Sequence, residues 1–519
     1  MHDDALLTME KITKVYSNGI VANNEVDFSI NRGEIHALVG ENGAGKSTLM
    51  RILFGLEESQ RGEIYLEGEQ IRINSPHEAI AHGIGMVHQH FMLVPSLTVA
   101  ENMILGVEPK RGLRIDLQKA IDSTRELAGK YNLAVDPMAR VQFLPVGTKQ
   151  KVEILKALYR GARILILDEP TAVLTPQETK ELFAELKLLK DQGNTIIFIS
   201  HKLHEVKELC DRITIMRNGR MQGTFNNEDV TPVDISRLMV GRDVILEVVK
   251  GAAAPRQVIL DVQNLVMAND LGQTAVRDIS FQVRRGEILG IAGVEGNGQR
   301  ELVEAITGLE RVARGQITIN GENIVKKSIK AIRELGTCHI PEDRMTYGVA
   351  EEMTIEQNLL ADKHDSREFT GAVLTKPKAI RALSQRLVDE YRIKCSTPLQ
   401  EVGMLSGGNI QKVVVAREFS SDPQLIVADQ PTRGIDVGAT EFIRKRLVEL
   451  RDEDAAVLLV SADLNEVLEL SDSLIVMYEG EVTAFFPDAS KVTEEELGLY
   501  MLGIKHQSPE EIGGVIYEK

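Results

Sequence analysis

The chain has 519 residues, too many for one hydrophobic core, since domains usually contain about 100–200 residues. Its apolar content of 43% and charged content of 26% are ordinary for a folded protein and exclude a disordered or fibrous chain. The formal net charge of −17 argues against a nucleic-acid partner, because DNA and RNA are repelled by an acidic protein.

The cysteines and the apolar runs indicate the compartment. Cys210, Cys338 and Cys395 are far apart and form no CxxC pair, so we expect neither a disulfide framework nor a zinc site. No apolar run approaches the ~18–20 residues that span a bilayer, and the N-terminus lacks the basic start and apolar stretch of a signal peptide. We therefore expect a cytoplasmic protein.

The sequence repeats itself. Arg32–Ile35 recurs as Arg285–Ile288, 253 residues later, whereas Asp168 corresponds to Asp429, 261 residues later. The second copy therefore carries eight extra residues between about 342 and 405. Such a repeat predicts two copies of one supersecondary arrangement.

The repeat also sets the expected domain boundaries. We expect one domain at 5–242 and another at 257–505, joined by a short, small-residue-rich linker at 243–256. The acidic tail 506–519 is expected to be poorly tied to the core.

Apolar, β-rich runs followed by a turn and a helix-compatible stretch predict an α/β fold with a parallel sheet in each unit. Ligand sites in such sheets lie beyond the carboxyl ends of the strands. The predicted buried strands are 35–39, 164–167 and 195–199 in the first unit and 288–292, 425–428 and 456–460 in the second.

A phosphate-binding loop follows the first of these strands. It fits GxxxxGK[ST], with a strand before it and a helix after it, and this context supports a P-loop. Lys46 would neutralise the β- and γ-phosphates, the Ser47 hydroxyl would ligate Mg²⁺, and the backbone N–H groups would wrap the phosphates. The predicted nucleotide-binding residues of this loop are Gly40, Glu41, Asn42, Gly43, Ala44, Gly45, Lys46, Ser47 and Thr48.

Polar residues at the ends of two further strands fit the same chemistry. Asp168 could hold the hydration shell of Mg²⁺, and Glu169 could polarise an attacking water. Such an acidic pair alone could be a solvated turn, but a P-loop in the same unit favours catalysis. His201 ends the next strand; a lone histidine is often structural, yet this sheet edge favours contact with the γ-phosphate.

With these motifs, the chain resembles the ABC ATPase family in two tandem copies, over essentially its whole length. The segment 405–411 (Leu-Ser-Gly-Gly-Asn-Ile-Gln) is similar to the signature motif of that family. Gln89 matches a family residue at the nucleotide and its metal, and Tyr16 is similar in position to the aromatic that stacks on adenine. The resemblance implies tandem P-loop domains, each with a parallel-sheet core and a helical signature subdomain.

The resemblance further implies head-to-tail pairing, in which each ATP lies between the P-loop of one unit and the signature of the other. The first composite site then contains every expected element, with Lys46, Gln89, Glu169 and His201 as catalytic residues. Its metal ligands are Ser47, Gln89 and Asp168, and the second unit contributes Ser406, Gly407, Gly408, Gln411 and Asp436.

The second composite site departs from the family pattern at nearly every position. Gln299 and Arg300 replace the lysine and the hydroxyl of the P-loop, and Gln430 replaces the general base. Glu342 and Ala462 stand where Gln89 and His201 stand in the first unit, and the opposing signature 144–150 begins Leu-Pro-Val-Gly. We expect this site to bind nucleotide, or to support the pairing of the two units, without hydrolysing ATP. The alternative is that the site is only a scaffold and binds no nucleotide.

A two-state ATPase must act on something. The combination of a degenerate second P-loop and an intact second signature resembles simple-sugar-type importers. The segments 88–102 and 429–439 are similar to the nucleoside-importing branch of that family. This resemblance implies ATP and Mg²⁺ as cofactors, two transmembrane permease subunits, an indirect extracellular binding lipoprotein, no nucleic acid, and a peripheral place on the cytoplasmic face of the membrane.

Two alternative functions stay open. A sugar importer of the same family would share every motif named above. A soluble tandem ABC protein acting on ribosomes or DNA would resemble pairs with two intact sites and a longer, charged linker, whereas this chain has one damaged site and a net charge of −17.

Overall fold

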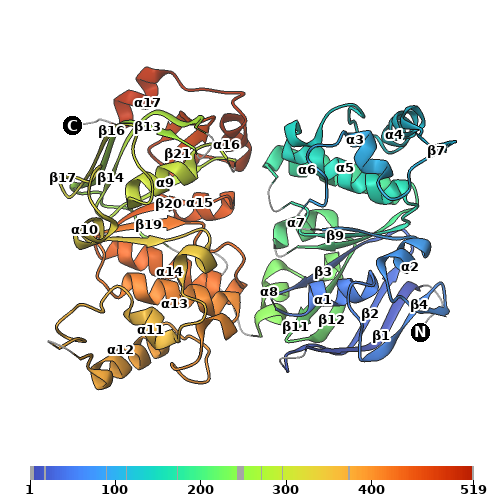
Figure 1. Ribbon diagram of the computed structural model, residues 1–519, viewed down its shortest axis with the longest axis horizontal. Helices are drawn as coiled ribbons and strands as arrows, with labels where there is room; N and C mark the ends of the chain where they lie inside the picture. Colours follow the sequence, from blue (N-terminus) through green and yellow to red (C-terminus); the bar gives the residue numbers. More distant parts are fainter. Residues whose placement is uncertain are drawn as a thin grey trace. The chain divides into compact units, whose positions relative to one another are not determined.

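The computed structural model describes residues 5–16, 19–41, 43–88, 91–112, 114–171, 174–200, 202–241, 250–269, 272–294, 296–371 and 374–516. The chain divides into two units, Met1–Val244 (the first unit) and Ile245–Lys519 (the second unit). Both units are α/β, as predicted, and the strands of their two larger sheets follow one another in the same order (Figure 1).

A six-stranded sheet forms the centre of the first unit. Its strand order is β12-β11-β3-β10-β9-β6, parallel except for β12 at the edge. The three predicted strands are confirmed, because their apolar runs are buried on both faces of a parallel sheet. The strands are β3 (Ile35–Gly40), β6 (Ile84–Val87), β9 (Ile164–Asp168), β10 (Thr195–Ile199), β11 (Arg212–Arg217) and β12 (Arg220–Asn226).

A second, antiparallel sheet lies against one face of the first and was not predicted. Its order is β2-β1-β4-β5, and its inward side chains, among them Leu7, Met9 and Phe28, share one apolar core with Leu38 and Ile197 of the central sheet. The strands are β1 (Ala5–Val15), β2 (Val21–Asn31), β4 (Arg61–Leu66) and β5 (Glu69–Ile71).

Helices α3 to α6 gather on the side of the central sheet opposite to the antiparallel sheet (Figure 1). Helix α5 begins within the segment 144–150, so the predicted helical signature subdomain is present. The helices are α1 (Lys46–Leu53), α2 (Pro76–Ala81), α3 (Val99–Ile104), α4 (Leu117–Tyr131), α5 (Val146–Tyr159), α6 (Pro176–Asp191), α7 (Leu203–Leu209) and α8 (Pro232–Val240), with a small hairpin of β7 (Lys110–Arg111) and β8 (Arg114–Ile115).

The second unit repeats this arrangement with sheets ordered β18-β19-β20-β15-β21-β22 and β14-β13-β16-β17. Its predicted strands are confirmed. The strands are β13 (Val258–Ala268), β14 (Thr274–Arg284), β15 (Ile288–Ala292), β16 (Arg314–Ile319), β17 (Glu322–Asn323), β18 (Thr337–Ile340), β19 (Leu425–Asp429), β20 (Ala456–Val460), β21 (Ser473–Tyr478) and β22 (Glu481–Phe486).

The helices of the second unit again lie on both sides of its central sheet. A single π-helical turn, Arg344–Gly348, follows β18. The α-helices are α9 (Gln299–Thr307), α10 (Ile329–Glu334), α11 (Ile355–Leu360), α12 (Pro377–Glu390), α13 (Gly407–Phe419), α14 (Val437–Asp452), α15 (Leu464–Leu470), α16 (Glu494–Met501) and α17 (Pro509–Ile516).

The two ends of the second unit are anchored to it. Within the predicted linker, the ammonium of Lys250 donates a hydrogen bond to the carbonyl of Leu470 (3.0 Å), and Arg451 donates one to the carbonyl of Gly251 (3.2 Å). The expectation of a loosely tied tail after residue 505 is wrong. Gln507 bonds the backbone of β22, and Ile512 of α17 packs on the apolar core, because the tail is amphipathic as well as acidic.

In the part of the chain that the structure describes, no helix is long and apolar enough to cross a membrane. All three cysteines lie within the described ranges and are free thiols. Burial raises the pKa of the thiols of Cys210 and Cys338 well above the usual value, so both are inert, apolar core residues.

Candidate functional site

The turn between β3 and α1 contains the predicted phosphate-binding loop of the first unit. Gly45 has a φ of 98°, and a Cβ at this position would lie 2.1 Å from the carbonyl oxygen of Ala22 in β2. A Cβ on Gly40 would lie 2.4 Å from the carbonyl of Met216 in β11. Only glycine fits both positions, because any side chain would clash with these backbone carbonyls. The loop leads directly into the N-terminus of α1, where the backbone N–H groups of the first turn favour an anion.

Lys46, the first residue of α1, is buried within this loop. Its ammonium donates hydrogen bonds to the carbonyls of Gly40 (2.7 Å) and Glu41 (3.0 Å). Burial lowers the pKa of Lys46, while the carboxylates of Glu169 and Asp168 act in the opposite direction. A cation held in a partly desolvated loop attracts an incoming phosphate strongly, because little water screens it.

Asn23 supports the loop from β2 and was not predicted from the sequence. Its side chain is fully buried, and Nδ2 donates a hydrogen bond to the carbonyl of Gly45 (3.1 Å). Among the described residues, its Oδ1 has no hydrogen-bond partner. An asparagine in a strand of mixed polar and apolar residues has no recognisable spacing to the P-loop, so only the fold reveals this contact.

Tyr16 lies beside α1, immediately after β1. Its phenol is 3.3 Å from the hydroxyl of Thr48, and the ammonium of Lys14 is 5.4 Å from the centre of its ring. An aromatic ring at the end of the phosphate loop can stack on a nucleobase.

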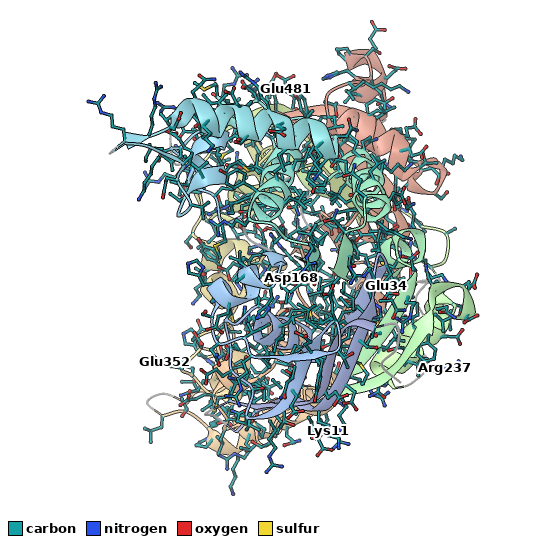
Figure 2. All side chains as sticks on the ribbon, turned by 90° about the vertical axis from the view of Figure 1, so that its right-hand side faces the viewer. Lys11, Glu34, Asp168, Arg237, Glu352 and Glu481 are labelled. Atoms are coloured by element: carbon teal, nitrogen blue, oxygen red, sulfur yellow. The ribbon has the colours of Figure 1, made fainter. Side chains whose placement is uncertain are left out.

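Asp168 and Glu169 lie at the carboxyl end of β9, as predicted for the strand that carries them; Asp168 is labelled in Figure 2. Burial raises the pKa of Asp168, as does the neighbouring Glu169, whereas Lys46, Arg51 and a hydrogen bond with Ser47 lower it. The Ser47–Asp168 pair offers the hydroxyl and carboxylate oxygens that Mg²⁺ prefers.

Glu169 adopts a left-handed backbone conformation with a φ of 49°, which is unusual for a glutamate. Its N–H donates to the carbonyl of Ile199 (3.0 Å), so the turn after β9 is tied to the end of β10. The predicted site residues Asn42, Gln89 and His201 lie outside the described residues.

The signature of the second unit begins α13. Ser406 is the N-cap residue, and its hydroxyl oxygen accepts a hydrogen bond from the amide of Asn409 (2.8 Å). A Cβ on Gly408 would lie 2.4 Å from a carboxylate oxygen of Asp436. Glycine at this position therefore lets Asp436 approach the first turn of α13 closely, and the N-terminal backbone amides of such a helix favour an anion.

Gln411 and Asp436 act on the backbone of their own unit. Nε2 of Gln411 donates to the carbonyl of Pro431 (2.8 Å), and the carboxylate of Asp436 caps α14 by accepting from the N–H of Ala439 (2.7 Å). Both were predicted to bind nucleotide; in the second unit taken alone they shape the loop 431–436, and this structural role was not predicted.

The P-loop of the second unit has lost the groups that bind phosphate. The side-chain amide of Gln299 donates a hydrogen bond from Nε2 to the carbonyl of Val294 (3.2 Å), within the same loop. Arg300 forms an ion pair with Glu304 (2.8 Å) along α9. Gln430 accepts a hydrogen bond from the N–H of Ala462 (3.0 Å), and a neutral amide cannot take a proton from water.

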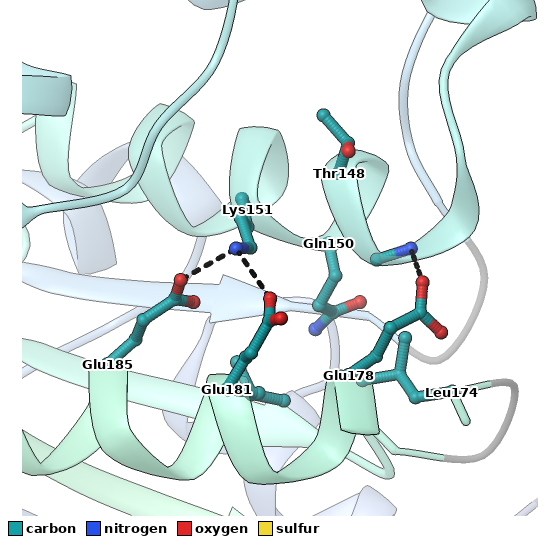
Figure 3. Close-up of a pocket in the computed structure, with 9 residues that line it drawn as sticks. Thr148, Gln150, Lys151, Leu174, Glu178, Glu181 and Glu185 are labelled. Carbon is teal, nitrogen blue, oxygen red and sulfur yellow. Dashed lines mark hydrogen bonds and ion pairs between the residues drawn. The ribbon is translucent and has the colours of Figure 1, made fainter. Parts of the chain in front are cut away.

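The signature of the first unit is altered in a similar way. Pro145 is the N-cap of α5 and offers neither a hydroxyl nor an N–H. The N–H of Gly147 donates to the carboxylate of Glu178 (3.3 Å), so an anion from α6 already occupies this helix N-terminus. Figure 3 shows Glu178 beside Gln150 in a small pocket, with the ion pairs from Lys151 to the glutamates farther along α6.

Asp429, the counterpart of Asp168 in the second unit, has a strongly raised pKa. The pKa of Asp429 is raised to about 7, mainly by burial and further by the neighbouring Glu342, while Arg433 opposes the shift. Because the folded state holds this proton more tightly than the unfolded chain does, the free energy of unfolding falls as the pH rises from about 4 to about 7.

We expect Asp429→Asn to stabilise the protein at pH 8, by at most about 4 kcal/mol, and to have little effect near pH 4. The amide keeps the shape of the acid without its buried charge. Calorimetric unfolding of the full-length chain at both pH values measures the difference, with the exposed Asp422→Asn as control. The same shift in unfolding temperature at both pH values would contradict the assignment.

Comparison with known proteins places the chain in a family. The protein-family model described as ABC transporter matches residues 23–172 and 276–433, which is more than half of the chain. The chain belongs to the ABC transporter family as a tandem pair of its ATP-binding domains, which confirms the predicted family, fold class and ATP as ligand.

Several relatives match along nearly the whole length. Guanosine import ATP-binding protein NupO of Bacillus subtilis is 44% identical over 96% of this chain and 97% of its own. Nucleoside import ATP-binding protein NupA of Lactococcus lactis is 43% identical over 97% and 99%, and glucose import ATP-binding protein TsgD13 of Haloferax volcanii is 43% identical over 97% and 96%.

A solved structure is similar over both units. The archaeal ribosome recycling factor aABCE1, in complex with the ribosomal stalk protein aP1, has a TM-score of 0.58 over 90% of this chain and 87% of that chain. At 18% identity this likeness concerns the fold alone.

Proposed function

We propose that the chain is the ATP-hydrolysing subunit of an importer for nucleosides, with domains at 5–242 and 257–505. The observation that carries the proposal is the group of Lys46, Ser47, Asp168 and Glu169, which the first unit brings together at one edge of its central sheet. The relatives named for the import of guanosine, nucleosides and glucose support coupling of this group to transport.

In this proposal each of the site residues in the first unit has a specific role in binding or hydrolysing ATP. The α1 amides and Lys46 bind the β- and γ-phosphates, and the ring of Tyr16 stacks on the adenine. Ser47, Asp168 and Gln89 would hold Mg²⁺, which neutralises phosphate charge when bound. His201 would contact the γ-phosphate.

Glu169 would act as the general base. Its carboxylate accepts a proton from the attacking water as the water oxygen bonds to the γ-phosphorus and the bond to the ADP oxygen breaks, giving ADP and phosphate. Its place beside the tied ends of β9 and β10 supports this role, because a base must be held at hydrogen-bond distance from the water.

The signature of the second unit would complete this site. If the units pair head to tail, as proposed, the γ-phosphate would meet the hydroxyl of Ser406 and the amides of Gly407 and Gly408. The opposite pairing would bring Gln299, Arg300 and Gln430 against Pro145, and there the lost charges and the missing base support a site without hydrolysis.

Exposed apolar side chains at equivalent positions of the two units support contact with two permease subunits. Phe143 and Met404 correspond by the 261-residue offset, and each lies three residues before the first residue of its signature helix. They are exposed by 76% and 71%. Met138 and Leu399, related by the same offset, are exposed by 56% and 49%. Large apolar side chains that are exposed to solvent at equivalent positions of both units are typical of a protein contact surface. Contacts between these side chains and the permease subunits would hold the chain at the cytoplasmic face of the membrane.

The choice of nucleoside over sugar rests on the relatives and on segments 88–102 and 429–439. We expect deletion of the gene to abolish uptake of labelled guanosine, with recovery on return of the wild-type chain and none with Glu169→Gln. Uptake of labelled glucose and ribose in the same strains is the control. Loss of sugar uptake instead would establish the simple-sugar alternative, and unchanged uptake of all three would contradict the importer.

A further inference from the structure

The residue of the second unit that stands in the place of Gln89 has a structural partner. Glu342 follows β18 and forms an ion pair with Arg433, which belongs to the loop after β19. Glutamate in place of the glutamine therefore does more than remove a proposed metal ligand. Its negative charge also links two loops of the second unit through the ion pair with Arg433.

Arg344 adds two further bonds between the same loops. Its guanidinium donates to the carbonyls of Arg433 (2.8 Å) and Gly434 (3.2 Å). A Cβ on Gly407 would lie 2.9 Å from Nη2 of Arg344, so the guanidinium packs directly on the signature glycine. The forked geometry of arginine suits this double contact, because a separate guanidinium nitrogen donates to each carbonyl.

The opposite side of the loop 431–436 is fastened to the signature helix. Nε2 of Gln411 bonds the carbonyl of Pro431 (2.8 Å), and the carboxylate of Asp436 abuts Gly408 while it caps α14. The loop is thus held by α13 on one side and by the segment 342–344 on the other.

In the first unit, whose signature is degenerate, the glutamine contact is not formed within the described ranges. Nε2 of Gln150, the counterpart of Gln411, is buried there without a hydrogen-bond partner, and the N–H of Gly147 is taken by Glu178. Figure 3 shows the Gln150 amide directed into the pocket between α5 and α6. The counterparts of Arg433 and Gly434 lie outside the described residues.

We propose that Glu342, Arg344 and Arg433 form a brace that holds the signature corner of the second unit in the geometry required by ATP bound to the first unit. The inference rests on the proposed function and on head-to-tail pairing. In it, Glu342, which replaces the glutamine of the site predicted not to hydrolyse ATP, serves the site that does hydrolyse it. They are positioning residues, since they act through Ser406, Gly407 and Gly408.

The physical reason is pre-organisation. A helix N-terminus stabilises the γ-phosphate in the transition state only if its amides and hydroxyl are already in place, because ordering them during the reaction would raise the barrier. The ion pair of Glu342 with Arg433 and the two hydrogen bonds of Arg344 restrict the corner before nucleotide arrives.

The test exchanges the charges of the brace in the full-length chain. We expect Glu342→Arg and Arg433→Glu each to lower kcat for ATP by about tenfold, and the double variant to recover most of the loss because it restores an ion pair. Glu342→Gln, which is milder and keeps the shape, should also lower kcat. Affinity for ADP should stay unchanged in all of them, since ADP has no γ-phosphate for the signature to contact.

The matched control is Arg314→Gln, which breaks an exposed ion pair with Asp278 (3.2 Å) between β16 and β14 of the second unit without touching the signature or the P-loop, and should leave kcat unchanged. A wild-type kcat in Glu342→Gln, no recovery in the double variant, or a parallel loss of ADP affinity would each overturn the brace. A wild-type chain without any ATP turnover would instead refute the proposed function, so the two failures are distinguishable.

Discussion

Glu169→Gln is expected to lower ATP turnover by about 10²–10⁴-fold, the usual contribution of a general base. The amide has nearly the same shape, but it cannot accept the proton of the attacking water. Binding of ATP should persist, because the α1 amides and Lys46 are unchanged. Lys46→Ala, in contrast, should lose both turnover and affinity, since it removes the buried cation of the loop.

Steady-state release of phosphate and equilibrium binding of ATP to the purified chain separate the two variants. Gln430→Glu is the matched control, because it places a carboxylate at the equivalent turn of the second unit. It should add no turnover, as Gln299 cannot supply the charge of Lys46 there. Substantial steady-state turnover in Glu169→Gln or in Lys46→Ala would refute the proposed site.

Ser406→Arg is expected to be as damaging as loss of the P-loop lysine, with a fall in turnover of about 10²-fold or more. Ser406 lies in the second unit, and the substitution fills the N-terminus of α13 with a long side chain where the γ-phosphate would bind. A substitution in the second unit can lower ATP turnover at the P-loop of the first unit only if the two units share one site.

The equivalent position of the first unit provides the control for this prediction. Pro145→Arg introduces the same residue at the start of α5. In the proposed pairing this helix would face the P-loop without lysine, so the variant should keep most of the turnover. Equal losses in the two variants, or wild-type turnover in Ser406→Arg, would reject the head-to-tail arrangement.

Much of the fold follows from local patterns. The strands that end in Gly40, Asp168 and Ile199 are short apolar runs beside motif residues, and such runs are buried on both faces of a parallel sheet. The antiparallel sheets were missed because strands such as β1 alternate irregularly between buried and exposed residues, with bulges in their pairing. The tail after residue 505 was misjudged because its acidic composition obscured the apolar side that packs on β22.

The sequence by itself determined the family, the two units and the asymmetry between them, because glycines, a lysine and paired carboxylates at these spacings are specific to a phosphate-binding loop and its metal. Only the tertiary structure decided which charges meet. The pairing of Glu342 with Arg433, the fork of Arg344 and the support of Gly45 by Asn23 join residues from separate strands and loops. Such contacts depend on the register and direction of side chains across the fold, which no local pattern of residues encodes.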